Sequence, residues 1–260
     1  MKIRFFQVDA FTNKPFKGNP AGVCLLDAPM NEQEMLAVAA ENSVPETAFL
    51  FKDGDVYHLR WFSPAVERPL CGHGTLATAH VLWEHQLAAP DETLRFQTVS
   101  GELTAAKRGS RIELNFPARA CNAIDLPSEL KELFGDNYVN AVFSHDRYIV
   151  ELHTAEQVIG FEPDLQLLRN YGCVITSRWN GAPYDFVSRY FALPVGVQED
   201  PVTGSAHCSL ATYWAERLHK TEFLAYQASA RGGELRVILQ GDRVLLQGEA
   251  VTVIEGTMHM

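Results

Sequence analysis

The chain has 260 residues, of which 47% are hydrophobic, and its formal net charge at pH 7 is -10. This length allows one large domain or two smaller ones, each with enough apolar residues for a core of its own. Nucleic acid is not an expected partner, because binding to phosphate backbones requires clustered Lys and Arg, and the sequence contains no basic run.

The sequence also carries no signal for export or membrane insertion. Residues 1–9 predict a strand and lack the apolar stretch and small-residue cleavage site of a secretory signal. No apolar run reaches the ~20 residues that are needed to span a bilayer. The five cysteines are scattered and never form a C-x-x-C pair, which indicates reduced thiols without structural zinc. We therefore expect a cytoplasmic protein without a membrane partner.

The first half of the chain alternates apolar stretches with turn residues in a pattern typical of strands around two helices. A segment dense in Gly, Pro and Asn over residues 12–22 predicts a loop, and Asn31 is a candidate helix cap. Strands are expected at 3–9, 23–26, 46–51, 56–62, 94–98, 103–106 and 111–116, and helices at 29–42 and 72–85.

Glu46 is the first residue of one of these predicted strands. Pro45 ends the preceding helix and biases the chain toward extended geometry, and the residues after Glu46 are apolar. A carboxylate in this place is either a solvated charge at the end of a strand or a buried functional acid. The local pattern leaves both interpretations open.

A glycine-rich turn runs into an apolar helical pattern at residues 70–83, with Gly72 and Gly74 on either side of His73. A helix start leaves backbone N–H groups unpaired and carries partial positive charge, and glycine lets a ligand approach the backbone closely. This arrangement predicts a binding site for a carboxylate or phosphate group. His73 is either structural or a proton relay, since histidine titrates near neutral pH.

The same design recurs at residues 203–214, where Gly204 and Ser205 lead into a second apolar helical pattern. The tripeptide Leu-Ala-Thr occurs at 76–78 and again at 210–212, and matching segments flank both copies in the same order. Several matches in one order indicate a duplicated half. We expect two domains, residues 1–118 and 119–260, with a C-terminal strand that can cross back to the first.

The second half repeats the mixture of strands and helices. Asp200 lies in the segment Glu199-Asp200-Pro201, just before the second helix start, where an acidic residue is either a helix cap or a functional acid. Helices are expected at 127–133, at 163–170 and from 203, and strands at 137–143, 148–152, 173–176, 184–191, 227–229, 234–239, 243–247 and 251–254.

Several other chemistries find no support in the sequence. There is no G-x-S-x-G elbow around Ser205, no Walker A lysine and no H-E-x-x-H motif, and no metal is expected. Cys71 and Cys208 flank the two glycine turns, which raises the alternative of a pair of catalytic thiols. Alignment of Gly72 with Gly204 pairs Cys71 with Thr203 instead, so helix-start packing is the favoured role of both thiols.

Five segments, in order along most of the chain, resemble the phenazine-biosynthesis-isomerase-like (PhzF-like) family. Each segment alone is a weak signal, and together they are specific. They are Phe6-Gln7-Val8-Asp9-Ala10-Phe11-Thr12, Gly18-Asn19-Pro20-Ala21-Gly22-Val23, Pro45-Glu46-Thr47-Ala48-Phe49, Leu70-Cys71-Gly72-His73-Gly74-Thr75-Leu76-Ala77 and Glu199-Asp200-Pro201-Val202-Thr203-Gly204-Ser205-Ala206-His207.

The resemblance implies a diaminopimelate-epimerase-like α/β (α+β) fold. In this fold two similar halves each wrap a barrel-like sheet around a central helix, the active site lies in the cleft between them, and a homodimer is the family expectation. It implies that Glu46, His73 and Asp200 are catalytic and that the substrate-binding residues are Gly72, Gly74, Gly204, Ser205 and Asn19. Gly74 departs mildly from the alanine or other small residue common in the family, which affects the shape of the pocket more than its chemistry.

The implied activity is that of an isomerase without a cofactor, which moves a proton on a small carboxylic acid. Glu46 acts as the general acid and base, a role that is expected to require a pKa raised toward neutrality. Two alternatives stay open: an amino-acid epimerase or racemase that uses Glu46 with Cys71 or Asp200, and a non-catalytic protein that binds small acids. Fold membership alone does not decide between them.

Overall fold

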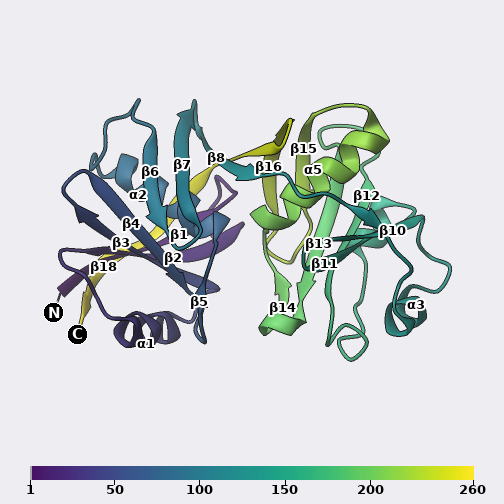
Figure 1. The fold of residues 1–260 in the computed structure, drawn as a ribbon, viewed down its shortest axis with the longest axis horizontal. Helices are drawn as coiled ribbons and strands as arrows, with labels where there is room; N and C mark the ends of the chain where they lie inside the picture. Colours follow the sequence, from purple (N-terminus) through teal and green to yellow (C-terminus); the bar gives the residue numbers. More distant parts are fainter. Residues whose placement is uncertain (1) are drawn as a thin grey trace. The chain divides into compact units, whose positions relative to one another are not determined.

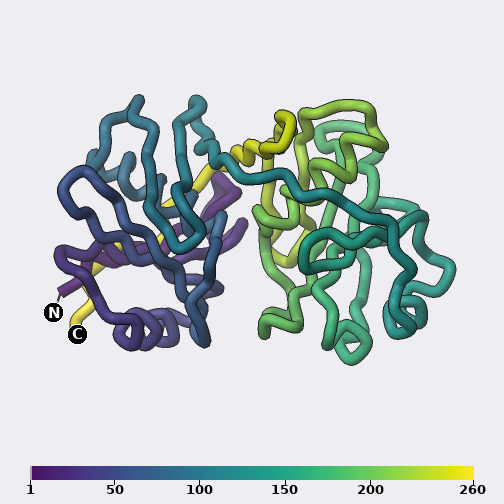
Figure 2. Tube along the Cα trace, viewed as in Figure 1, coloured from purple at the N-terminus to yellow at the C-terminus, as the bar shows by residue number. Residues whose placement is uncertain are grey.

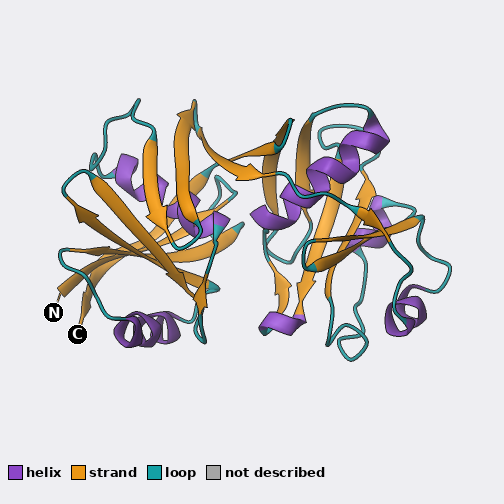
Figure 3. Cartoon of the chain, viewed as in Figure 1, coloured by secondary structure: helices purple, strands orange, loops and turns teal. Residues whose placement is uncertain are grey.

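The computed structural model describes residues 2–260 and divides the chain into two compact units (Figure 1, Figure 2). The first unit comprises the residues up to Phe116 together with Leu246–Met260, and the second comprises Pro117–Leu245. Each unit is a mixed α/β structure in which strands surround a buried helix (Figure 3). Within residues 2–260, none of the helices has the length and apolar character required to cross a membrane.

The first unit is a continuous series of paired strands with two helices. Strand β1 pairs with both β18 and β2 in antiparallel fashion, β2 pairs with β3 in parallel, β3 with β4 antiparallel, and β4 with β6 in parallel. Its elements are β1 (Lys2–Ala10), β2 (Asn19–Leu26), α1 (Glu32–Asn42), β3 (Glu46–Asp53), β4 (Val56–Phe62), β5 (Glu67–Arg68), α2 (Gly72–Glu84), β6 (Leu94–Thr98), β7 (Gly101–Arg108), β8 (Arg111–Pro117) and β18 (Ala250–His259).

Helix α2 is the buried centre of the first unit. Its first three turns carry small residues and apolar side chains on nearly every face, and a helix that is apolar all round belongs inside a core. It contacts β1, β2, β3 and β18 of the surrounding strands. The expected helix at 72–85 is therefore confirmed, and its N-terminus lies within the unit.

The other helix of this unit, α1, begins at Glu32 and not at the predicted residue 29. Asn31 caps it, because its side chain accepts a hydrogen bond from the Glu34 amide while Glu34 reaches back to the Asn31 amide. The expected loop over residues 12–22 is shorter than predicted. Asn19–Gly22 already belong to β2 and pair with Gln7–Ala10, and this pairing overrides their turn-forming composition.

The second unit contains a second series of paired strands around α5. Strands β11 and β12 are parallel, as are β13 and β15, while β10 with β11, β12 with β13 and β15 with β16 are antiparallel. Its elements are β9 (Asn122–Ala123), α3 (Ser128–Phe134), β10 (Asn140–Ser144), β11 (Arg147–Glu151), α4 (Ala155–Ile159), β12 (Gly172–Arg178), β13 (Phe186–Ala192), a 3-10 turn (Leu193–Val195), β14 (Val197–Asp200), α5 (Gly204–Leu218), β15 (Glu222–Gln227), β16 (Gly233–Gln240) and β17 (Arg243–Gly248).

Two expectations for the second unit are wrong. Residues 165–170 form turns and not a helix. The Asp164 carboxylate accepts hydrogen bonds from the amides of Gln166 and Leu167, as a helix cap does, but only one helical bond follows, from the Leu168 amide to the Asp164 carbonyl. The helix near this point is α4, which Thr154 and Gln157 cap reciprocally. The strand expected at 227–229 is β15, which ends at Gln227.

Candidate active site

Glu46 is the first residue of β3, where the chain leaves the turn made by Val44 and Pro45. Strand β3 runs parallel to β2, which places Glu46 opposite Ala21 in the register. The Glu46 side chain is only 16% exposed. The open question from the sequence is thus resolved in favour of a largely buried carboxylate.

His73 is the second residue of α2 and is almost completely buried. Its Nε2 atom lies 3.2 Å from Oε2 of Glu46, which is hydrogen-bond distance. The structure therefore brings together two of the predicted site residues that come from different elements, the start of a strand and the start of the central helix. The N-terminus of α2, with Gly72 as its first residue, is next to this pair in the chain.

Cys71 forms the N-cap of α2, and its sulfur accepts a hydrogen bond from the Gly74 amide at 3.3 Å. The same sulfur lies 3.6 Å from Nδ1 and 3.9 Å from Nε2 of His73. One donor atom each from Glu46, Cys71 and His73 fit within 4.8 Å of one another, which is compact enough for a metal ion. Motif spacing in the sequence does not reveal this cluster, because Glu46 comes from β3 whereas Cys71 and His73 come from the start of α2.

Asn19 is completely buried at the start of β2. Its side-chain amide lies 3.3 Å from Nδ1 of His73, on the other side of the ring from Glu46. An amide can present either its oxygen or its NH₂ group, and the tautomer of the ring decides which one fits. The position predicted to bind substrate is thus in direct contact with His73.

Arg68 is a neighbour of Glu46 that the sequence analysis missed. It belongs to β5, a short strand that pairs with the end of β4, and its Nε atom lies 3.8 Å from Oε1 of Glu46. Nothing in the local pattern distinguishes Arg68 from other basic residues on strands. Only its position just before the glycine-rich turn could have drawn attention to it.

The charges of Glu46 and His73 stabilise each other. Burial alone would raise the pKa of Glu46, but the hydrogen bond from His73 and the charges of His73 and Arg68 outweigh it, so that the pKa is lowered. Burial alone would lower the pKa of His73, but the Cys71 sulfur and the Glu46 carboxylate raise it well above its ordinary value. The expected upward shift of the Glu46 pKa is therefore wrong, because a resting imidazolium–carboxylate pair replaces the isolated buried acid.

The predicted residues of the second unit form a group of their own. Helix α5 begins at Gly204 after the N-cap Thr203, whose hydroxyl donates to Oδ2 of Asp200 at 2.5 Å. The Ser205 hydroxyl accepts a hydrogen bond from Nη1 of Arg147 at 3.2 Å. Asp200 and Ser205 thus lie at one helix start, as Glu46 and His73 do at the other.

Arg147 is a second residue that the sequence analysis missed. It begins β11, is almost completely buried, and stacks its guanidinium over the ring of Tyr190 at 4.6 Å from the centroid. Asp146, Tyr190 and Asp200 keep its pKa raised against the effect of burial. It is a fixed cation beside Ser205 at the start of α5.

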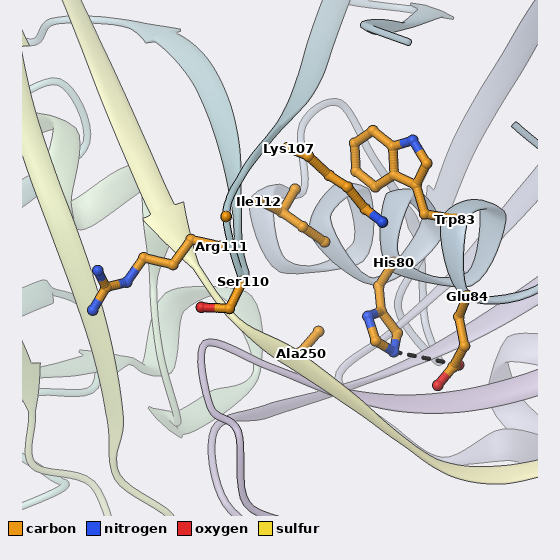
Figure 4. A pocket seen from close by; sticks show the side chains of 9 residues that line it. His80, Trp83, Glu84, Lys107, Ser110, Arg111, Ile112 and Ala250 are labelled. Atoms are coloured by element: carbon orange, nitrogen blue, oxygen red, sulfur yellow. Dashed lines mark ion pairs between the residues drawn. The ribbon is translucent and has the colours of Figure 1, made fainter. Parts of the chain in front are cut away.

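A pocket elsewhere in the first unit contains none of the predicted site residues (Figure 4). His80, Trp83 and Glu84 line it from α2, and Lys107 and Ile112 from β7 and β8. Within it, Nε2 of His80 lies 3.3 Å from Oε2 of Glu84 (Figure 4). His80, Trp83 and Glu84 come from the C-terminal part of α2, whereas the Glu46–His73 pair lies at its N-terminus.

Comparison with known proteins places the whole chain among relatives of the same length. The profile of the family described as "Phenazine biosynthesis-like protein" matches residues 8–256. An uncharacterized isomerase of Halalkalibacterium halodurans is 46% identical over 262 residues, which cover 99% of this chain and 99% of that protein. The crystal structure of a PhzF family protein from Enterococcus faecalis superposes with a TM-score of 0.94 at 37% identity and covers 100% of both chains.

More distant structures share the fold alone. A hydroxyproline epimerase from Agrobacterium vitis, solved with bound trans-4-hydroxy-L-proline, has a TM-score of 0.64 at 12% identity and covers 98% of this chain and 92% of its own. The predicted fold of two similar halves of the epimerase type is confirmed. The chain belongs to the phenazine biosynthesis-like (PhzF) protein family, several of whose bacterial members are named isomerases, and it is an enzyme of this isomerase type.

Proposed function

We propose that this protein is an isomerase that moves a proton on a small carboxylic acid, with Glu46 as the general acid and base. The observation that carries the proposal is the buried contact of 3.2 Å between Glu46 and His73 at the start of α2. A carboxylate and an imidazolium in one water-poor site can supply a base and a stabilising positive charge to the same substrate.

In the proposed reaction, Glu46 takes a proton from a carbon next to the substrate's carboxyl group or conjugated with it. The C–H electron pair moves into the adjacent π-system, and His73 and Arg68 stabilise the negative charge that develops. The proton then returns from Glu46 to another carbon, and the double bond shifts accordingly. Substrate and product have the same atoms and electrons, so the reaction balances without a redox cofactor.

The lowered pKa of Glu46 makes it a weak base while it is paired with His73. We propose that substrate binding loosens this pair, because the substrate's carbon displaces the imidazolium from Glu46. The loss of that hydrogen bond removes the largest influence that lowers the carboxyl pKa, and burial then favours protonation. General acid and base catalysis of this kind contributes a factor of about 10²–10⁴ to the rate.

The substrate carboxylate is proposed to bind to backbone amides at the helix starts, at Gly72 and Gly74 of α2 and at Gly204 and Ser205 of α5. These amides are helix-start donors with partial positive charge. Asp200 is proposed to orient the substrate or to relay the proton. We propose, as the family resemblance implies, that the reaction takes place in a cleft between the two halves.

The proposal is tested by proton NMR in D₂O with a panel of amino acids, hydroxy acids and dihydro-aromatic acids. We expect the wild-type protein to exchange or move one carbon-bound proton, and Glu46→Gln to lose this activity by roughly 10²-fold or more. The matched control is Glu132→Gln, which changes an exposed glutamate of α3 in the same way. Full activity of a folded Glu46→Gln protein would refute the assignment.

The contact between Cys71 and His73 favours a second candidate, an amino-acid epimerase that uses Cys71 as a second acid or base. Burial raises the pKa of the Cys71 thiol, so at neutral pH the thiol stays protonated and could donate a proton but seldom accept one. Chiral analysis of the product separates the candidates. If the product has an inverted stereocentre and Cys71→Ala does not form it, the protein is an epimerase. If Cys71→Ala still forms a positional isomer, the protein is the isomerase that uses Glu46 as acid and base.

A further inference from the structure

We propose that Glu46, Cys71 and His73 together bind one thiophilic divalent cation of the Zn²⁺ type, and that this cation blocks the site. The binding itself follows from the donor atoms and does not depend on the proposed function. The consequence for activity rests on it, because the cation would occupy the carboxylate and the imidazole that the proposed reaction uses.

The donor set matches the chemistry of zinc. Thiolate, imidazole and carboxylate are its three protein ligand types, and three protein ligands with an open fourth position are typical of reactive zinc sites. Cys71 distinguishes this set from one that would prefer Mg²⁺ or Ca²⁺, since those ions favour oxygen ligands. The cluster is therefore selective by the identity of its atoms.

The distances between donors are close to those around one tetrahedral ion. Bond lengths to zinc imply that sulfur, nitrogen and oxygen ligands lie roughly 3.3–3.6 Å apart. Nε2 of His73 lies 3.2 Å from Oε2 of Glu46 and 3.9 Å from the Cys71 sulfur, and the three donors lie within 4.8 Å of one another. Glu46 is the most exposed of the three side chains, so its carboxylate is the ligand with the most room to adjust.

The surrounding residues support this geometry. Nδ2 of Asn19 lies 3.3 Å from Nδ1 of His73, and rotation of the amide by about 180° would let its oxygen accept the Nδ1 proton while Nε2 binds the cation. A partner on the second ring nitrogen is the usual support of a metal-bound histidine. The Cys71 sulfur is fixed at the N-cap of α2, where the Gly74 amide and the partial positive charge of the helix start favour a thiolate once the metal displaces its proton.

Binding is opposed by the protons that His73 and Cys71 must release and by one neighbouring charge. The Arg68 guanidinium lies 3.8 Å from Glu46 and repels a second positive charge. The cation must therefore compete with Arg68 for the carboxylate, and replacement of Arg68 by the neutral Gln is expected to strengthen binding. This direction is specific to a cation at Glu46, because the loss of a merely structural arginine would not improve metal affinity.

The test uses Co²⁺ as an optical stand-in for Zn²⁺ with the full-length protein, without any substrate. We expect a near-ultraviolet thiolate-to-cobalt absorption band that saturates at one ion per chain and disappears when Zn²⁺ is added. Cys71→Ser should lose the band, and Cys121→Ser, which changes a half-buried thiol of the second unit, should keep it. Asn19→Ala should keep the band and weaken binding by about 10–100-fold.

The absence of the band in the wild-type protein, or its persistence in folded Cys71→Ser, would overturn the proposal. Because Ser retains an N-cap acceptor, this variant keeps the helix start intact. Once a substrate is known, Zn²⁺ should inhibit turnover in the wild-type protein, and EDTA should restore it. An unsuccessful substrate search would leave the optical result standing, so the two proposals can fail separately.

Discussion

Cys71 and Thr203 occupy the same position in the two units: each is the N-cap of the buried central helix, and both have extended backbone geometry. Their side chains act differently. The Cys71 sulfur accepts a hydrogen bond from the Gly74 amide, whereas the Thr203 hydroxyl donates to Asp200 and makes no cap bond. The alignment of the two glycine turns thus matches the structural positions, and the two caps make different hydrogen bonds.

This difference predicts the cost of removing the Cys71 side chain. Cys71→Ala leaves a buried helix-start amide without its acceptor and should lower the free energy of unfolding by about 0.5–2 kcal/mol. Cys71→Ser replaces the acceptor and should recover most of this loss. Urea denaturation followed by circular dichroism measures both variants, and an equal loss in both would show that packing of the sulfur, and not capping, carries the effect.

Gly74 is expected to be intolerant of substitution. A Cβ atom at this position would lie 2.8 Å from Cδ1 of Trp61 and 3.0 Å from the Cys71 sulfur, and Trp61 is completely buried. Gly74→Ala should therefore destabilise the protein by about 1–3 kcal/mol, because a well-packed side chain has to move. Gly256→Ala on β18 is the matched control, since a Cβ atom added there would have no neighbouring atom within 4 Å. Thermal denaturation should show a lower melting temperature for the first variant only.

Asn19 is expected to act through His73 and not by binding the substrate directly. The contact with Nδ1 fixes the orientation and tautomer of the ring that faces Glu46. Asn19→Ala should lower kcat by about 10–100-fold if its effect resembles that of other groups that orient a histidine. Steady-state kinetics with an identified substrate check this, and an effect on KM alone would indicate a direct substrate contact instead.

His207 predicts a loss of stability in acid. It is completely buried in α5, Nδ1 contacts the Thr203 carbonyl at 2.8 Å, and burial lowers its pKa from 6.5 to about 4. The unfolded chain takes up a proton on this histidine below pH 6.5, whereas the folded protein does so only near pH 4. Stability from this group is therefore complete above pH 6.5 and is lost as the pH falls toward 4, by up to about 3 kcal/mol.

Denaturant titrations between about pH 7 and pH 4 measure this loss. His207→Gln should flatten the pH dependence, because the variant has no group to titrate at this position. His219→Gln, which changes an exposed histidine at the end of the same helix, should leave the slope unchanged. The prediction is contradicted if the free energy of unfolding changes with pH equally steeply in the wild-type protein and in His207→Gln.

The features that could be predicted from the sequence are those set by neighbouring residues. The start of α2 at Gly72, the cap at Asn31 and the repeated helix start at Gly204 all follow from local patterns of glycine, small residues and capping groups. At residues 163–170 the apolar pattern predicts a helix, but the structure forms only a capped turn at Asp164.

The surroundings of Glu46 could not be predicted in the same way. Arg68 reaches it through the pairing of β4 with β5, and His73 reaches it through the packing of α2 against the strands. Both depend on tertiary contacts, and the direction of the Glu46 pKa shift depends on both. The sequence therefore indicates candidate residues, whereas their tertiary contacts set the direction in which their pKa values shift.

The pairing of β1 with β18 has a consequence for how the protein is made. Lys2 pairs with His259 and Ala10 with Ala250, so the first sheet joins two segments that lie far apart in the sequence. During synthesis on the ribosome, the contiguous residues 117–245 become available for folding before β18 has emerged, while β1 must wait for it. The unit that contains Glu46 and His73 is thus the one that matures later, although its first strands are synthesised earlier.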